Sequence, residues 1–197
     1  MGKIFYIMGK SASGKDHVYR SLLEETDLPL REFTIFTTRP IRHGETDGKE
    51  YYFVDEKRLN ELRADGKIIE ERSYDTVHGV WTYFTADDGK TDLEQYDYLG
   101  IGTLESYAKL RQYYGADRLV PIYIEVEDGI RLGRALARER QQEAPKYKEL
   151  CRRFLADCED FSEEKITELG IERRFYNNET LEVCRKEVEE YIAFMIY

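Results

Sequence analysis

Residues 3–16 are Lys3-Ile-Phe-Tyr-Ile-Met8 and then Gly9-Lys-Ser-Ala-Ser-Gly14-Lys15-Asp16, and they say more about the fold than any other stretch. An apolar run with strand character leads into a loop of small residues, which ends in Gly-Lys at the start of a helical pattern. This layout is one step from the phosphate-binding pattern G-x-x-x-x-G-K-[ST]. Two glycines let the backbone turn so that its N–H groups point at phosphate oxygens, and the helix dipole adds positive potential. The predicted phosphate-binding residues are Gly9, Lys10, Ser11, Ala12, Ser13, Gly14 and Lys15, with the Lys15 charge on the outer phosphates.

Asp16 stands where this pattern has a Ser or Thr whose hydroxyl contacts Mg²⁺. A carboxylate in the first turn of a helix is favourable without any metal. It is also a hard oxygen ligand that can reach Mg²⁺ directly or through water. Two interpretations of Asp16 therefore stand side by side, a helix-start acid and a magnesium ligand. The loop as a whole has a plainer interpretation, a flexible turn, which the flanking strand and helix disfavour.

The composition fits one soluble domain with a charged surface. The chain has 197 residues, of which 41% are hydrophobic, and this is enough for a core. Its net charge of −10 argues against general binding of nucleic acid or of an anionic membrane. An anionic substrate is still compatible, because several positive residues gather in a few segments. These are Lys15, Arg39, Arg42, Arg134, Arg138, Arg140, Arg152 and Arg153.

The compartment is predicted from what the sequence lacks. No apolar run approaches the length of a membrane span, and no signal peptide is recognisable. The three cysteines, Cys151, Cys158 and Cys184, are odd in number and lack the spacing of a metal site. We expect reduced, buried thiols in a cytoplasmic protein.

Strand-like and helix-like segments alternate along the chain, which favours an α/β fold with a mainly parallel sheet flanked by helices. Asp55 is predicted to cap a helix that runs through Ala64. Strands are predicted at residues 3–8, 32–36, 51–54, 67–71, 80–85, 96–101, 119–126 and 173–176, and helices at 15–26, 55–64, 104–114, 128–142, 146–160 and 179–194.

Two segments interrupt this alternation. Residues 33–86 combine short strands with one helix and are predicted to form an inserted substrate-binding lobe. Residues 134–154 form a basic helical hairpin, broken at Glu143-Ala-Pro145, and are predicted to form a lid. The remaining residues, 1–32, 87–133 and 155–197, would then form the core of a single domain.

A second motif is Thr37-Thr-Arg39-Pro-Ile-Arg42-His-Gly-Glu45-Thr-Asp-Gly-Lys-Glu-Tyr51-Tyr-Phe-Val54. Two arginines three residues apart in a turn can converge on one phosphate, because Arg offers bidentate contact to its oxygens. The motif resembles the guanylate kinase family, whose sequences carry T-T-R-x-x-R-x-G-E-x-x-G-x-x-Y-x-F-V after the phosphate-binding loop. Every fixed position is filled here, and the resemblance is clear over residues 1–85 and 119–185.

This resemblance implies a P-loop NTPase fold with an inserted lobe that binds a nucleoside monophosphate (NMP). It also implies transfer of the γ-phosphoryl group of ATP to an NMP, in the first place GMP, with Mg²⁺ as cofactor. Glu45 would orient the arginines. The alternative for this cluster is a surface group of ion pairs. The residues implied to hold the acceptor phosphate are Arg39, Arg42, Tyr51 and Tyr83.

Recognition of the base is also implied by the resemblance. Ile68-Ile69-Glu70 and Tyr83-Phe84-Thr85 are similar to the family's F-I-E and Y-G-S/T. Glu70 would accept hydrogen bonds from N1 and N2 of guanine, which presents two adjacent N–H groups, and Thr85 would contact the base edge. The alternative for Glu70 is an exposed strand glutamate.

The chain departs from the family's pattern at three places. The family's base-contacting Ser, four residues before the first motif arginine, is Ile35 here. The family's acidic D-x-D at the end of the third core strand corresponds to Leu99-Gly-Ile-Gly102, which has no acid. Asp16 is one hypothetical replacement for that carboxylate near the metal. Residues 74–79 are extra relative to the family.

The basic hairpin resembles the family's lid. Arg134, Arg138 and Arg153 match its arginine positions, and arginines that arrive on closure can stabilise charge on the transferring phosphoryl group. The alternative is a solvated basic helix face. Asn178, in Asn178-Glu-Thr-Leu181, is similar to the family's N-D-D-L, where the Asn sits near adenine. Asn178 is equally suited to cap a helix.

Three functions follow in order of preference. The first is a guanylate kinase-like enzyme, a monomer or homodimer, in which Lys15, Arg39, Arg138 and Arg153 are catalytic. The second is a related kinase with another acceptor such as ribose 1,5-bisphosphate, since such enzymes can also have G-K-D in the loop. The third is a binding module with the kinase fold and weak catalysis. The missing D-x-D favours the third, and the intact Gly14-Lys15 pair disfavours it.

Overall fold

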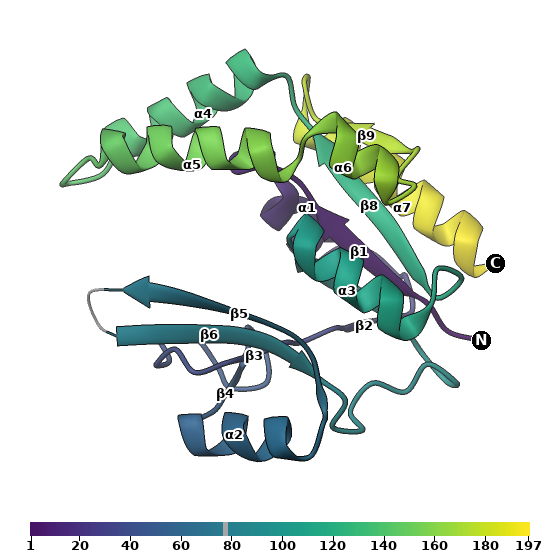
Figure 1. The fold of residues 1–197 in the computed structure, drawn as a ribbon. Helices are drawn as coiled ribbons and strands as arrows, with labels where there is room; N and C mark the ends of the chain where they lie inside the picture. Colours follow the sequence, from purple (N-terminus) through teal and green to yellow (C-terminus); the bar gives the residue numbers. More distant parts are fainter. Residues whose placement is uncertain (77–78) are drawn as a thin grey trace.

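The computed structural model describes residues 1–76 and 79–197 and is drawn in Figure 1. A five-stranded parallel sheet forms its centre, in the order β2-β7-β1-β8-β9. The strands of this sheet are β1 (Ile4–Met8), β2 (Leu30–Glu32), β7 (Asp97–Gly102), β8 (Leu119–Glu125) and β9 (Arg174–Tyr176).

Strand β1 lies in the middle of this sheet, and all five of its residues are buried. Alternate side chains of a strand point to opposite faces, and both faces are covered here. Tyr6 packs with α3 (Leu104–Tyr114) and α6 (Glu163–Glu168) on one face. Ile7 packs with α1 (Lys15–Glu24) and α7 (Leu181–Ile196) on the other. This double burial explains why the first strand is a continuous apolar run.

A second sheet, in the order β4-β3-β6-β5, is built separately from the first. One of its faces buries Phe36 and Phe84 against Leu59 and Leu62 of α2 (Glu56–Ala64). Because side chains alternate along a strand, the neighbouring positions Thr37, Tyr83 and Thr85 share the other face. The strands are β3 (Phe36–Thr37), β4 (Tyr52–Phe53), β5 (Ile68–Thr76) and β6 (Gly79–Ala86).

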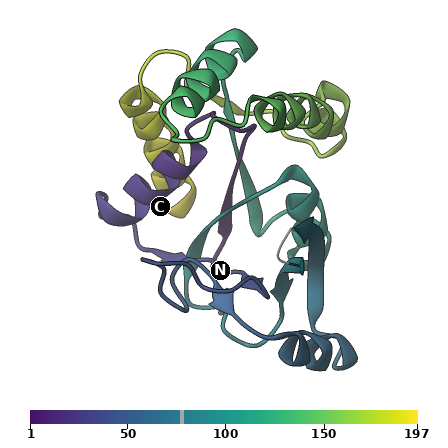
Figure 2. The same ribbon diagram turned by 90° about the vertical axis from the view of Figure 1, so that its left-hand side faces the viewer.

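A pair of helices, α4 (Asp128–Arg140) and α5 (Tyr147–Asp160), projects from the end of the central sheet toward which β1 points (Figure 1). The second sheet projects from the same end. The turned view keeps the two apart, with the helical pair at the top and the second sheet with α2 at the bottom (Figure 2). The chain has thereby an α/β fold with a parallel sheet flanked by helices, to which a smaller sheet and a helical pair are added.

Most predicted elements are present near their predicted bounds, but one predicted strand is wrong and one helix was missed. Residues 32–36 do not form one strand, because the chain leaves the central sheet after Glu32 and enters the second sheet at Phe36. Helix α6 was not predicted. Asp55 does cap α2, since its side chain accepts a hydrogen bond from the Arg58 N–H. The extra segment 74–79 includes residues 77–78, which lie outside the described residues.

The cysteines are free thiols with different surroundings. Cys184 is buried, and burial raises its pKa to about 12. Cys151 of α5 is exposed and Cys158 is half-buried, so the expectation of buried thiols is correct for Cys184 alone. Within residues 1–76 and 79–197, no helix is both long and apolar enough to cross a membrane.

Candidate active site

The glycine-rich loop between β1 and α1 adopts the backbone of a phosphate cradle. Ala12 has a φ of 63° and Gly14 a φ of 87°, both in the left-handed region, and this brings successive N–H groups to the inner side of the turn. The loop is held from outside by two side chains. The Asn177 amide donates to the Ser13 carbonyl at 2.8 Å, and the Asp157 carboxylate accepts from the Ser11 N–H at 2.9 Å.

Lys15 opens helix α1 at the end of this loop. Its Nζ lies 3.7 Å from a carboxylate oxygen of Asp16. Lys15 and Ser11 line two cavities at once, one of about 570 Å³ and one of about 450 Å³. The lysine charge therefore stands where these two spaces meet.

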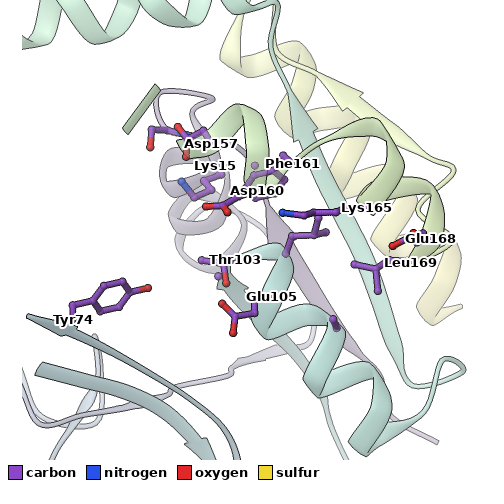
Figure 3. Close-up of a pocket in the computed structure, with 15 residues that line it drawn as sticks. Lys15, Tyr74, Thr103, Glu105, Asp157, Asp160, Phe161, Lys165, Glu168 and Leu169 are labelled. Carbon is purple, nitrogen blue, oxygen red and sulfur yellow. The ribbon is translucent and has the colours of Figure 1, made fainter. Parts of the chain in front are cut away.

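The first cavity lies between the loop and the second sheet. Thr103 and Glu105, at the start of α3, form one wall, and Tyr74 of β5 stands across the opening from them (Figure 3). Asp157 and Asp160, at the end of α5, also line it. The shape suits an acceptor that approaches the loop from the second sheet.

The other two cavities lie on the helical-pair side of the loop. Arg138 and Arg153 line the 450 Å³ cavity together with Lys15. Arg134, Arg138 and Asn177 line a further cavity of about 670 Å³, which reaches Gly14 and Asp16. The three cavities thus follow one another around the loop, and the predicted lid arginines gather on one side of it.

Asp16, the predicted metal ligand, is an exposed carboxylate directly after Lys15. Its side chain is 71% exposed and lines both cavities on the helical-pair side. Among the described residues, no three His, Cys, Asp or Glu side chains form a metal cluster. Mg²⁺ commonly takes one or two carboxylates and fills its other positions with waters and phosphate oxygens, so a single carboxylate beside the phosphate cradle fits such an ion.

Arg39 and Glu45 form a bidentate ion pair at 3.0 and 2.8 Å, and Arg39 is only 3% exposed. The contact with Glu45 raises the pKa of Arg39, and the same contact lowers the pKa of Glu45. Glu45 also accepts from the Arg42 N–H at 2.7 Å. One carboxylate thus holds the guanidinium of Arg39 and the backbone of Arg42. The orienting role of Glu45 stays a prediction.

The two predicted tyrosines join this cluster. Tyr51 and Tyr83 meet edge to face, with ring centroids 5.5 Å apart, and the Arg39 guanidinium lies 5.4 Å from the Tyr51 ring. Burial raises the pKa of Tyr51, so its hydroxyl remains a donor at neutral pH. Tyr74 extends the row, because its ring lies 5.9 Å from that of Tyr83. The arginine cluster is therefore connected to the wall of the 570 Å³ cavity.

Glu70 and Thr85, the two residues predicted to contact the base, lie next to each other. Thr85 Oγ1 donates to Glu70 Oε1 at 3.0 Å. The sequence analysis missed Arg72, whose Nε donates to Glu70 Oε2 at 2.9 Å. Alternate residues of a strand share a face, so the positions of residues 70 and 72 on β5 could have indicated that Arg72 lies beside Glu70. The expectation of an exposed strand glutamate is wrong, because the Glu70 side chain is 0% exposed.

The helical pair is joined to the loop by Arg131, which the sequence analysis also missed. Arg131 is 1% exposed and pairs with Asp128 at 2.9 Å and with Asp157 at 3.1 Å. The predicted Arg153 lies nearer the tip, where its Nε donates to Glu149 at 2.9 Å. An arginine within a basic helix gives no sequence signal of burial.

The two asparagines before α7 have different surroundings. Asn178 Oδ1 accepts from the Glu127 N–H at 2.8 Å and ties the segment after β9 to the start of α4. Helix α7 is capped by Thr180, which excludes the helix-cap role for Asn178. Asn177 is 2% exposed, its Oδ1 has no hydrogen-bond partner within the described residues, and it lines the 670 Å³ cavity. Of the two, Asn177 is the one beside the predicted nucleotide site.

The first part of the chain is similar in sequence to known proteins. Residues 1–82 match the family model described as guanylate kinase. The guanylate kinase of Nitrosomonas europaea is 38% identical over 79 residues, which cover 40% of this chain and 37% of that protein. That of Lactobacillus acidophilus is 36% identical over 73 residues, 37% of this chain and 36% of that protein. The match thus spans little more than a third of each relative.

The fold likeness covers more of the chain. A crystal structure of guanylate kinase from Anaplasma phagocytophilum superposes with a TM-score of 0.64 and 19% identity, over 99% of this chain and 84% of that chain. At this identity the likeness concerns the fold. Sequence relationship is therefore concentrated in the loop and the second sheet, while the arrangement of elements is shared throughout.

Proposed function

We propose that this chain, whose first 82 residues match the guanylate kinase family model, transfers the γ-phosphoryl group of ATP to a nucleoside monophosphate. The observation that carries the proposal is the position of Lys15 at the junction of two cavities, one lined by lid arginines and one facing the second sheet. GMP is the acceptor that the sequence resemblance implies.

On the donor side, the loop N–H groups and Lys15 bind the phosphates of ATP. The nucleoside occupies the 670 Å³ cavity, where Arg134 and the Asn177 amide are available to the base. The free Oδ1 of Asn177 supports this assignment, because a buried acceptor without a partner is costly until a ligand supplies a donor. The predicted contact of Asn178 with adenine stays a prediction.

On the acceptor side, Arg39, Arg42, Tyr51 and Tyr83 bind the phosphate. Glu45 holds Arg39 by two hydrogen bonds and so limits the rotamers that the guanidinium can adopt. Tyr83 and Tyr74 lead from this cluster toward the cavity in which Lys15 stands. Residues 33–86 would thus act as the NMP-binding lobe.

In phosphoryl transfer the protein mainly positions the two substrates and supplies positive charge to the transferring group. Arg138 and Arg153, in residues 134–154, would approach the transferring group when the helical pair closes and excludes water. The core residues 1–32, 87–133 and 155–197 provide the fixed frame. Arg131 joins the bases of α4 and α5 to the loop through Asp157. These residues belong to the fixed frame, so residues 134–154 would move relative to an anchored base.

Mg²⁺ would be held by Asp16 together with phosphate oxygens of ATP. When bound, it neutralises charge on the phosphates. We place the reaction in the cytoplasm, with ATP and the monophosphate as partners, no nucleic-acid or membrane ligand, and a monomer or homodimer as the assembly.

The test is transfer of labelled γ-phosphate from ATP to GMP, with the product separated by chromatography. We expect labelled GDP with the wild-type protein and at least about a hundredfold less with Lys15→Met. The variant lacks the positive charge that stabilises the negative charge of the outer phosphates in the transition state. Label that appears only as inorganic phosphate would overturn the proposal. Label on ribose 1,5-bisphosphate would support the alternative kinase, and ATP binding without transfer would support the binding module.

A further inference from the structure

Glu70, the carboxylate predicted to receive guanine, is already occupied. Its Oε2 accepts from Arg72 Nε at 2.9 Å, and its Oε1 accepts from Thr85 at 3.0 Å and from Arg72 NH2 at 3.4 Å. The side chain is 0% exposed. A purine that approaches this face therefore does not meet a free carboxylate.

Arg72 is the charged group that remains accessible. Its side chain is 11% exposed, and its NH1 donates to Thr103 Oγ1 at 3.2 Å. Thr103 lines the 570 Å³ cavity, and Tyr74, two residues after Arg72 on the same face of β5, lines it too. Arg72 thus bridges the second sheet and the cavity wall. A guanidinium has five N–H donors, of which three are used here.

The strong contact with Glu70 keeps Arg72 charged. Burial alone would lower the pKa of Arg72, but the Glu70 carboxylate outweighs burial and raises it. The strand opposite supplies no second carboxylate, since β7 has glycine at positions 100 and 102. Nor is there room for one, because a Cβ on Gly102 would lie 2.0 Å from the Tyr6 hydroxyl oxygen. Glu70 and Arg72 therefore form a balanced pair, and Glu105 at the start of α3 is a further carboxylate on this wall of the cavity.

We propose that Arg72 is a specificity-determining residue that lets the acceptor pocket take xanthosine monophosphate (XMP) beside GMP. The proposal rests on the proposed function. Guanine and xanthine share the carbonyl at C6 and the N1–H, and they differ at C2. Guanine has an amino group there, which donates, and xanthine has a carbonyl, which accepts. A free carboxylate accepts from the amino group and repels the carbonyl. Here the carboxylate of Glu70 is buried and filled, and the unused N–H groups of Arg72 are donors that suit a carbonyl.

The experiment compares three acceptors, GMP, inosine monophosphate (IMP) and XMP. IMP differs from GMP only at C2, whereas XMP differs at C2 and also carries a proton at N3. Initial rates give kcat/KM for each, and a binding titration with a non-hydrolysable ATP analogue gives Kd without turnover. For the wild type we expect the kcat/KM for XMP to lie within about tenfold of that for GMP. A pocket that left the C2 carbonyl without a donor would lower the kcat/KM for XMP by more than about this factor, because an unmade buried hydrogen bond is costly.

Arg72→Met removes the donors and leaves Glu70 to receive the amino group of guanine. The ratio of kcat/KM for XMP to that for GMP should then fall by at least about tenfold. Arg72→Lys keeps a charge beside Glu70 but loses the fork, and it takes the place of the first variant should that fail to fold. Arg63→Met is the matched control, because Arg63 pairs with Glu71 on the outer face of the same strand at 2.9 Å.

Four outcomes are informative. An XMP ratio that falls with Arg72→Met but not with Arg63→Met supports the proposal. Use of GMP with neither binding nor turnover of XMP overturns it and leaves the proposed function intact. Binding of XMP within tenfold of GMP, with no phosphorylation of either, supports the pocket and overturns the proposed function. An unchanged ratio in the Arg72 variants overturns the role of Arg72.

Discussion

The side chain of Tyr6 on β1 fills the space beside Gly102 on the neighbouring strand β7. The Tyr6 hydroxyl donates to or accepts from Ser106 Oγ at 2.8 Å, and a Cβ built on Gly102 would lie 2.0 Å from the Tyr6 oxygen. The phenol of β1 thus fills the room that a side chain of β7 would need. Burial raises the pKa of Tyr6 to about 12, so the group is neutral. A neutral hydroxyl therefore stands beside the strand end to which the family resemblance assigned an acidic motif.

Gly102→Ala should destabilise the protein through this contact. Overpacking a buried site typically costs about 1–3 kcal/mol, and the midpoint of denaturant unfolding measures it. Tyr6→Phe in the same chain removes the hydroxyl and should recover part of the loss. Gly133→Ala is the control, because a Cβ there meets nothing within 4 Å and alanine favours a helix. Equal stability of Gly102→Ala and the wild type would contradict the account of this contact.

Glu45→Gln should weaken acceptor binding without abolishing transfer. The variant loses the charge that holds Arg39 at 3.0 and 2.8 Å, and the guanidinium then samples other rotamers. We expect KM for the acceptor to rise roughly tenfold, with a smaller change in kcat, since one charge-assisted pair is worth about 1.5–3 kcal/mol. Glu61→Gln, on the exposed Arg58 pair of α2, should leave KM unchanged. A fall in kcat alone would contradict an orienting role.

The tip of the helical pair should lose stability in acid through Glu149. Hydrogen bonds from Arg152 and Arg153 lower its pKa from 4.5 to about 2. The folded pKa lies below the unfolded one, so the contribution is complete above 4.5 and is lost as the pH falls from there toward 2.

The measurement is the free energy of unfolding of the wild type and of Glu149→Gln. Going from neutral pH into this acid window, the wild type should lose more than the variant. The pair is exposed to solvent, so the difference should stay below about 1 kcal/mol. A larger loss in the variant than in the wild type would contradict the sign.

Asp16→Ser should raise the Mg²⁺ concentration that gives half-maximal rate. The variant replaces the carboxylate that best fits the metal by a weaker ligand, and we expect a shift of roughly tenfold. Asp27→Ser is the control, since Asp27 is an exposed carboxylate beyond the end of α1. A rate that rises or is unchanged at low Mg²⁺ would show that Asp16 is only a helix-start acid.

The parts of the fold that follow from local pattern could be predicted from the sequence. The apolar run of β1, the loop after it and the Asp55 cap of α2 depend on near neighbours in the chain, and the structure has all three. The break between Glu32 and Phe36 could not be seen, because both halves have strand character and only the choice of sheet separates them.

In the candidate site, too, contacts between near neighbours could be predicted and contacts between distant residues could not. Arg39 and Glu45 lie within one motif, so their contact could be predicted from the sequence. The contacts of Tyr6 with Gly102, and of Arg131 with Asp157, join residues that are far apart in sequence. They depend on strand register and on how α4 and α5 meet, and neither is encoded in a short window.

Release of ADP from ATP tests the central claim most directly. It is measured with and without Mg²⁺, with GMP, dGMP, AMP, CMP, UMP and ribose 1,5-bisphosphate as separate acceptors. The account predicts Mg²⁺-dependent release that requires a nucleoside monophosphate, with GMP among those used. Release with ribose 1,5-bisphosphate alone, or no release with any acceptor from protein that binds ATP, would contradict it.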